Sequence, residues 1–425
     1  MNSLPIFFVS LFGMTTSVAF AQDFQSPGMP RTGNTSGQSG RFDNSFNPAI
    51  GLTLDLSGLY TDAAGSSNDG IDLELRSAEL SFGAWVDPTA HAYANFNYVG
   101  DELELEEAAA TYVGWDGNAT MKAGRFFVDF GKQMQAHIHS LRTYDRPAVL
   151  RTFLGEELGG DGVQYNDWTT MGDSTVVRWS LGAFGALVPH SHGHEGEEHE
   201  GGGDQEFASE PIFRPDLDEL ALTARLTGFA DVSEASTLQL GASARYLPGF
   251  EIHSEDGYIL AEVDQVASDL SNTVVGLDAT WSWLDESGTE GLTVGGEFLM
   301  IDGDLGGFFD DAGDDLGDPT AEPVDPEFSN NSIAVIDDTA TGFYAFVDYA
   351  LDMRSSLGLQ YSQVEVLEEG LPELDEWDVY YTHKLTEFQR MRFGVTRTEH
   401  EGDTDTRVSV QYTLFLGPHS HGVQF

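Results

Sequence analysis

Histidines in this sequence are concentrated in short tracts whose spacing suits metal binding. Residues 189–193 read Pro-His-Ser-His-Gly, and the same pentapeptide returns at 418–422. Histidines two apart in an extended chain project to the same side, so one ion can contact both imidazoles. Imidazoles with neighbouring carboxylates favour zinc or nickel over calcium or magnesium. The candidate metal ligands are His190, His192, His194, His199, His419 and His421, with a further pair, His137 and His139.

The metal interpretation has a plain alternative at each tract. His-rich tracts without fixed spacing bind metal weakly and promiscuously, so residues 190–199 also fit a solvated polar loop. At the end of the chain, the terminal Phe425 suits recognition by membrane-insertion machinery, which would leave the nearby histidines incidental. We therefore expect no required cofactor and weak zinc binding that falls with pH as the imidazoles protonate.

Basic residues form a second group with chemical potential. The chain carries 71 acidic residues against 19 basic ones, a net charge of −52. If a basic segment lay inside a water-filled channel, it would set up a transverse field against acidic walls. Alternatively, the same residues would pair with wall carboxylates and hold the segment in place. The segment in question contains Arg125, Lys132, Arg142, Arg146 and Arg151.

Composition and motifs exclude several classes of function. The chain has no cysteine, so disulfides and thiol catalysis are absent. Neither a Gly-x-Ser-x-Gly elbow nor a His-Glu-x-x-His motif occurs, and we expect no enzyme. Strong acidity repels nucleic acid and attracts cations, although a saline habitat would also produce it.

Alternating segments predict the elements that must position these side chains. In residues 90–98, Ala90, Ala92, Ala94, Phe96 and Tyr98 share one face, and polar residues such as Asn95 share the other. A strand between lipid and water has this pattern, and charged substitutions at Ala94 or Phe96 should harm folding whereas Asn95 should tolerate them. About sixteen such segments predict an all-β, transmembrane antiparallel barrel. The others are 50–60, 73–86, 107–113, 120–127, 162–168, 176–186, 220–229, 237–246, 274–283, 292–300, 341–351, 355–366, 378–385, 391–397 and 407–416.

Connections between these segments alternate in length. Short ones include 87–89, 116–118, 352–354 and 386–389, whereas 128–161, 187–217, 247–273 and 301–340 are long. Short periplasmic turns and long extracellular loops are typical of outer membrane barrels. The start of the chain, with an apolar stretch before Ala19-Phe20-Ala21, predicts a signal peptide. We therefore expect a signal peptide at 1–21, a short periplasmic segment at 22–48 and the barrel at 49–425.

One segment resembles a known family. Residues 124–132, Gly-Arg-Phe-Phe-Val-Asp-Phe-Gly-Lys, continue to Tyr-Asp-Arg-Pro at 144–147 and Phe-Leu-Gly-Glu-Glu at 153–157. This run resembles the porin O/P-like (phosphate-selective-porin-like) outer membrane proteins, within them a His-rich branch associated with zinc, whose ending is similar to residues 417–425. The resemblance implies a sixteen-stranded, trimeric diffusion channel with a third loop folded inward.

The predicted function is passive transport across a Gram-negative outer membrane. We expect a channel for small solutes that favours cations and is associated with divalent metal, zinc, uptake. The alternatives are an anion- or phosphate-selective porin, and a metal-binding surface protein without channel activity. The expected partners are outer membrane lipid, small solutes or divalent cations, and two further copies in a homotrimer, with no nucleic acid. The segment before the first strand is too short for the plug domain of an energised transporter.

Overall fold

The computed structural model describes most of the chain between residues 48 and 417. The described ranges are 48–63, 70–99, 102–172, 174–190, 207–211, 217–254, 266–310, 332–367, 370–400 and 402–417. The expected signal peptide, the segment that follows it up to residue 47, and the C-terminal tract lie outside the described residues. No helix within the described ranges is long and apolar enough to span a membrane.

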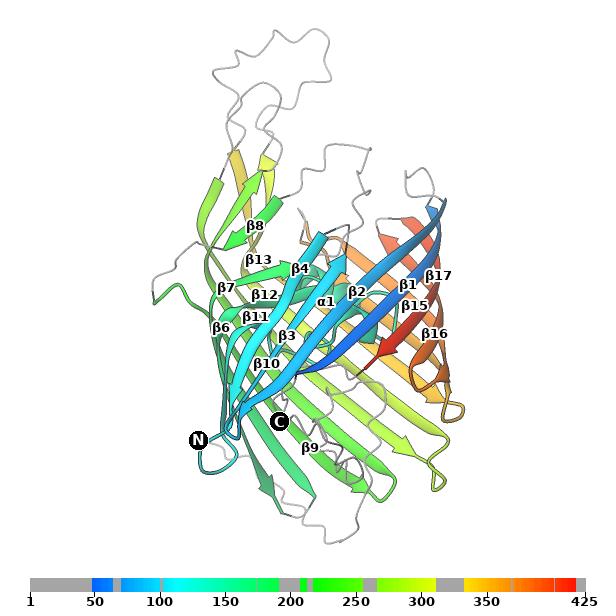
Figure 1. The fold of residues 1–425 in the computed structure, drawn as a ribbon. Coiled ribbons are helices and arrows are strands. Elements are labelled where there is room, and N and C mark those ends of the chain that lie inside the picture. The colour runs from blue at the N-terminus through cyan, green and yellow to red at the C-terminus, as the bar shows by residue number, and fades with distance from the viewer. Residues whose placement is uncertain are drawn as a thin grey trace, which may run out of the picture.

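The chain forms a closed, antiparallel β-barrel, as predicted (Figure 1). Its sixteen wall strands correspond one to one with the sixteen alternating segments. They are β1 (Ala49–Ala63), β2 (Gly70–Asp87), β3 (Ala90–Val99), β4 (Glu102–Tyr112), β5 (Thr120–Phe127), β6 (Glu157–Met171), β7 (Thr175–His190), β9 (Ala221–Ser233), β10 (Ser236–Ser254), β11 (Val266–Leu284), β12 (Gly291–Asp310), β13 (Ser332–Ala350), β14 (Ser355–Glu365), β15 (Glu373–Thr386), β16 (Gln389–His400) and β17 (Asp403–Leu416).

The barrel closes because its first and last strands pair. β1 runs antiparallel to β2 on one side and to β17 on the other, with Leu56 opposite Tyr412 in the closing ladder. The additional strand β8 (Phe207–Pro211) pairs with the far end of β10, above the point where β9 begins, so it adds no wall strand. Closure leaves no open edge, which is the condition for a sheet in lipid.

Alternation sorts side chains between the two faces as the sequence predicts. On β3, the polar set Tyr93, Asn95 and Asn97 is buried in the interior, at 4%, 0% and 1% exposure. The outer face carries large exposed apolar residues, among them Leu222, Leu226, Leu240, Leu277, Phe298, Leu359, Val379, Val395 and Val410. This apolar outer surface is what a lipid bilayer requires.

Several wall strands extend further than alternation indicates. β10 continues to Ser254 and β12 to Asp310, so much of the predicted loops 247–273 and 301–340 is paired strand. The extensions mix glycines and carboxylates with apolar residues, and Phe250 and Leu270 in them form a small buried cluster against which Leu247 and Val335 pack. Figure 1 shows these strands rising above the rest of the barrel.

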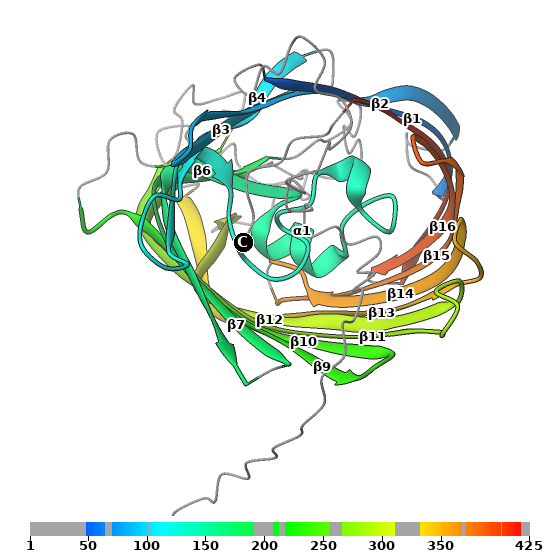
Figure 2. The ribbon, with the colours of Figure 1, turned by 60° about the horizontal axis from the view of Figure 1, so that its bottom comes forward.

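The third loop, residues 128–156 between β5 and β6, folds into the barrel (Figure 2). It contains a short 3₁₀ helix, η1 (Ile138–Ser140), and the helix α1 (Ala148–Leu154). The apolar side of α1, including Val149 and Leu150 at 0% exposure, belongs to one core with interior-facing wall residues Val274, Leu299, Ile301, Ala340 and Val364. Burial of this apolar surface therefore seats the loop against β11–β14.

Two further features fit α1 to the wall. A Cβ atom at Gly342 would lie 2.6 Å from the Val149 Cγ2 atom, so glycine there makes room for the helix. The free backbone N–H groups at the start of α1 donate to wall side chains, Ala148 N to Glu376 Oε1 (3.2 Å) and Val149 N to Ser362 Oγ (3.3 Å). The inward position of the third loop therefore depends on packing and on satisfied helix-end hydrogen bonds.

Candidate functional site

The candidate site is the barrel interior, where the third loop faces the wall. Four of the five predicted constriction residues lie there, and each contacts a different part of the interior. Their contacts decide whether they hold the loop or leave charge available to a permeating ion.

Arg146 holds the loop's own backbone together. Its guanidinium donates to the carbonyl oxygens of Gln133, Ala136 and Glu156, and lies 3.4 Å from Glu157 Oε1. The side chain is only 1% exposed. This planar group thus acts as an internal brace, a role for which its several fixed donors suit it.

Arg151 and Arg142 fasten the loop to the wall through carboxylates. Arg151 Nη2 bonds Glu376 Oε2, the same side chain that accepts from the start of α1. Arg142 lies 4.0 Å from Asp348 Oδ2 and stacks 4.1 Å above the ring of Phe346. The anchoring role that the sequence leaves open is therefore visible in the contacts of both residues.

Lys132 sits where the loop meets β10–β12. Its Nζ atom donates to Thr280 Oγ1 (2.6 Å) and Gln239 Oε1 (3.3 Å), and its backbone N donates to Glu297 Oε1 (2.8 Å). Burial, together with the nearby Arg142, lowers the pKa of Lys132 to about 7. Its positive charge is therefore sensitive to pH near neutrality.

Arg125 lies apart from the other four residues. On β5, Lys122 and Phe126 face the interior, so the odd-numbered Arg125 faces outward. There it pairs with Asp161 across the β5–β6 ladder at 2.9 Å, with 42% of its side chain exposed. Arg125 therefore does not belong to the interior group. Although it is close in sequence to the third loop, it lies on a strand, and successive side chains of a strand point to opposite faces.

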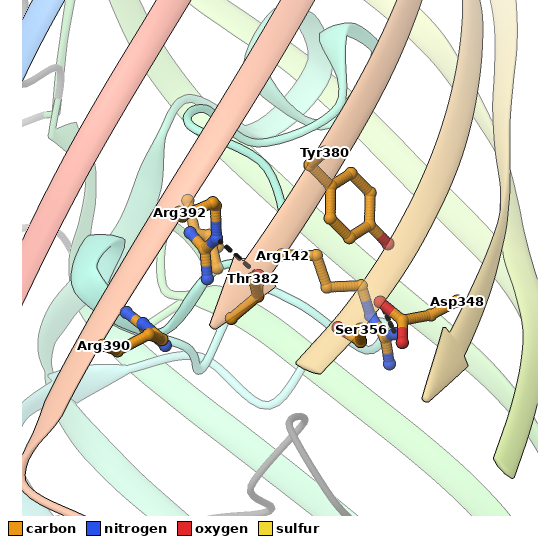
Figure 3. Close-up of a pocket in the computed structure, with 8 residues that line it drawn as sticks. Arg142, Asp348, Ser356, Tyr380, Thr382, Arg390 and Arg392 are labelled. Carbon is orange, nitrogen blue, oxygen red and sulfur yellow. Dashed lines mark hydrogen bonds and ion pairs between the residues drawn. The ribbon is translucent and has the colours of Figure 1, made fainter. Parts of the chain in front are cut away.

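The wall contributes basic residues that sequence reasoning overlooked. A small interior pocket is lined by Arg142 from the loop and by Arg390 and Arg392 from β16 (Figure 3). Arg392 donates to Thr143 O (3.1 Å) and Gln411 Oε1 (2.9 Å), which ties β16 and β17 to the loop. Alternation in the sequence could have placed Arg392 on the interior face, because the apolar residues Met391 and Phe393 stand on either side of it. The other interior basic residues are Arg76, Lys122, Arg178, Arg225, Arg245 and Arg407.

Carboxylates accompany most of these basic groups. Asp129 lies 2.8 Å from Arg178 and 3.6 Å from Arg225, and Asp278 lies 3.1 Å from Arg225. Asp145 bonds Arg407, and its pKa falls to about 2 because Arg407, Arg151 and Arg76 outweigh the effect of burial. The described interior is therefore close to balanced in charge, and most of the net −52 belongs to other parts of the chain.

His137 and His139 meet a group of buried carboxylates. The Nδ1 atom of His137 lies 3.0 Å from both Glu79 Oε2 and Glu106 Oε2, and its Nε2 atom lies 3.3 Å from Glu107 Oε2. Burial alone would lower the pKa of His137, but Glu79 and Glu106 raise it well above the ordinary imidazole value. The rings of His137 and His139 stack at 5.8 Å.

The other predicted metal ligands cannot be placed. His192, His194, His199, His419 and His421 lie outside the described residues, and His190 ends strand β7. Only the pair in the third loop therefore has described geometry. Spacing in the sequence did not reveal that its partners would be glutamates from β2 and β4.

Comparisons with known proteins agree with the fold. No family model matches the chain. An uncharacterized protein of Aquifex aeolicus (strain VF5) is 25% identical over 373 residues, which cover 84% of this chain and 71% of that protein. An anion-selective porin from Comamonas acidovorans has a TM-score of 0.51 at 9% identity, covering 87% of this chain and 99% of its own. The trimer form of OmpT, an outer membrane protein of Vibrio cholerae, has a TM-score of 0.52 at 10% identity, covering 87% and 100%.

Fold and interior together define the class. A closed sixteen-stranded barrel with an apolar outer surface, a polar interior and an inward third loop is the architecture of outer membrane porins. The chain therefore has the fold of outer membrane porins, and its apolar outer surface places the barrel in the outer membrane of a Gram-negative bacterium.

Proposed function

We propose that the protein is a passive diffusion channel for small solutes, that it favours cations and that it works as a homotrimer. The observation that carries the channel function is the polar, charge-balanced interior around a third loop anchored at several points. A loop fixed in this way narrows the barrel, and its anchors keep it from moving across the opening that remains. The same architecture gives no support to an enzymatic function, because a polar interior of this kind suits the passage of solutes through the barrel.

The preference for cations follows from where the charge lies. Most interior basic groups have carboxylate partners, so they offer little net attraction to anions. The remaining acidic residues of a chain with net charge −52 set the potential around the channel. Such a field concentrates cations near an entrance and depletes anions.

Planar-bilayer recording tests the channel and its preference together. Purified protein added to a bilayer should give stepwise conductance, and a salt gradient should give a reversal potential of the sign for cations. Absence of conductance steps from correctly folded protein would refute the channel. A reversal potential of the opposite sign would refute the cation preference alone.

Anion selectivity is the second candidate, and one observation favours it. Arg142, Arg390 and Arg392 meet at one interior pocket, whereas Asp348 is the carboxylate among its lining residues. The resemblance of residues 124–157 to phosphate-selective-porin-like proteins points the same way. Replacing Arg392 with Gln would shift the reversal potential strongly if this pocket controls selectivity, and little if the surrounding field does.

The proposal includes weak binding of zinc by the His-rich tracts. Weak binding at 190–199 and 418–422 would raise the local concentration of divalent cations beside a cation-favouring channel. Calorimetry should show weak zinc binding that is reduced when His190, His192, His194 and His199 become Ala, with conductance unchanged. Retained binding in this variant would remove the 190–199 tract from the proposal.

A further inference from the structure

A compact group of potential metal ligands lies where the third loop meets β2 and β4. Glu79, Glu106 and His137 each offer one ligand atom, and these atoms lie within 4.8 Å of one another. Ligand atoms in a tetrahedral zinc site, with bonds of about 2.0–2.2 Å, lie roughly 3.3–3.6 Å apart. The two separations of 3.0 Å from His137 Nδ1 to the glutamate oxygens are close to that spacing. A small outward relaxation would therefore admit an ion.

A β-bulge aims one of these ligands inward. Asn95 on β3 faces Glu107 on β4, and the next residue, Phe96, faces Leu105, so Glu106 is the extra residue of the bulge. Without the bulge, Glu106 and Glu107 would point to opposite faces of the strand. Bulges commonly redirect a side chain at a functional site. Here the bulge places two successive carboxylates inside the barrel.

Wall side chains orient the two carboxylates from the other side. Asn97 Nδ2 donates to Glu106 Oε1 at 2.5 Å, and Tyr93 donates its hydroxyl hydrogen to Glu107 Oε1 at 2.9 Å. Each glutamate therefore has one oxygen held by the wall and its other oxygen directed at His137. Supporting hydrogen bonds of this kind fix metal ligands in place and are part of a built site.

The ligand cluster contains an excess of carboxylates, whose negative charge a bound cation would neutralise. Glu79, Glu106 and Glu107 are buried, at 0%, 4% and 4% exposure, and the basic lysine paired with them is Lys122, 3.9 Å from Glu107. When His137 is neutral, as a metal ligand must be, three carboxylates and one ammonium leave two negative charges in excess, and a divalent ion would balance them in place of the proton that His137 otherwise carries. Burying excess negative charge without such compensation is costly.

We propose that Glu79, Glu106 and His137 bind one divalent transition-metal ion of the zinc class and thereby fasten the third loop to β2 and β4. One imidazole and two carboxylates form a mixed N/O donor set that suits zinc better than calcium or magnesium. His139 Nδ1, 3.5 Å from Glu79 Oε2, stands beside the open fourth position. This site is separate from the His-rich tracts at 190–199 and 418–422 and does not depend on channel activity.

Burial predicts how the bound ion behaves. His137 is 1% exposed and Glu79 is 0% exposed, so exchange with solvent requires the loop to leave the wall. Metal bound here should therefore resist a chelator as long as the barrel is folded, whereas metal on the tracts should be removed at once. Resistance to chelation distinguishes the two kinds of binding.

The test uses the full chain in a background that lacks the tracts. His190, His192, His194, His199, His419 and His421 are changed to Ala, and the protein is folded with zinc and then treated with EDTA. Elemental analysis should find one zinc ion per chain, and anomalous diffraction at the zinc edge should place it between Glu79, Glu106 and His137. Folded background protein without zinc, or with its anomalous peak elsewhere, would overturn the proposal.

Isosteric variants provide the matched comparison. Glu79→Gln and Glu106→Gln keep the shape of the side chain but remove its charge and replace one oxygen by an NH2 group, and each should weaken zinc binding by more than about tenfold. Glu74→Gln is the control, because Glu74 is also on β2 and holds the third loop through the Tyr144 hydroxyl at 2.6 Å. It should retain zinc. Equal zinc retention in folded Glu106→Gln and Glu74→Gln proteins would contradict the assignment.

Discussion

Lys132 makes the interior charge depend on pH. Its pKa of about 7 means that the ammonium is largely present at pH 6 and largely lost at pH 8. The carboxylates nearest to it, Asp278 and Glu297, lose a positive neighbour as the pH rises. We therefore expect cation preference to increase between about pH 6 and pH 8.

Reversal potentials recorded across this pH range check the effect of Lys132. Lys132→Met should make the step smaller, because the change of charge at that position is removed. Lys132→Arg should keep the charge at pH 8 and hold the cation preference at its lower value. A step of the same size in all three proteins would assign it to another group.

Arg146 should be difficult to replace even by lysine. A lysine cannot reach the carbonyls of Gln133, Ala136 and Glu156 together, so buried acceptors would lose their donors. We expect Arg146→Lys to reduce the free energy of unfolding by about 2–4 kcal/mol in a urea titration. The outward-facing Arg125→Lys is the control, and its exposed pair with Asp161 should be worth less than about 1 kcal/mol. Equal losses would refute the bracing role.

At the scale of elements, helix α1 determines whether the third loop stays inside. Leu150 is fully buried on its apolar side, whereas Thr152 on the same helix is half-buried. Leu150→Asp would bury an unpaired charge against β11–β14 and should release the loop, giving larger and noisier single-channel currents. Thr152→Asp should leave the currents nearly unchanged. Identical traces from both variants would mean that apolar packing does not seat the loop.

The two faces of the wall strands should differ in their tolerance of charge. Leu277 faces outward on β11 with 62% exposure, and Ser282 on the same strand faces the interior. Leu277→Arg should destabilise the folded barrel by about 2–4 kcal/mol in a folding titration, and Ser282→Arg by much less. Similar losses at both positions would contradict the assigned register.

Asn95 corrects a prediction made from alternation alone. Its interior orientation is as predicted, but its side chain is 0% exposed and donates to Glu107 Oε2 at 3.2 Å. A charged residue at this position would meet the third loop and the glutamate cluster rather than water. The interior face is therefore tolerant of charge only where the loop does not cover it.

At the scale of the whole molecule, the separation of charge predicts a dependence on salt. Interior pairs are short and buried, so salt screens them weakly, whereas the acidic residues outside the interior are screened within a Debye length of about 10 Å at 0.1 M salt. We expect cation preference to fall steadily when reversal potentials are measured at a fixed gradient from 0.05 to 1 M salt. A preference independent of salt would locate the selective charges inside the barrel.

Strand order and face were predictable from the sequence for a physical reason. Period-two alternation is imposed by lipid on one side and a polar interior on the other. The two faces of each strand can therefore be assigned from the residues of that strand alone. The alternation of short and long connections likewise reflects local chain reversal. Closure of β1 on β17 then follows, because an unpaired edge is not viable in lipid.

The arrangement of the site could not be read in the same way. Arg125 and Lys132 look equivalent in the sequence, yet one faces outward and the other lies inside, because the first belongs to a strand and the second to a loop. The bulge that turns Glu106 inward appears in the sequence only as two successive glutamates in an otherwise alternating segment, and Glu79 meets His137 from a strand far away in the chain. Contacts of this kind depend on how the loop packs across the barrel, which local alternation does not encode, so only the tertiary structure decided them.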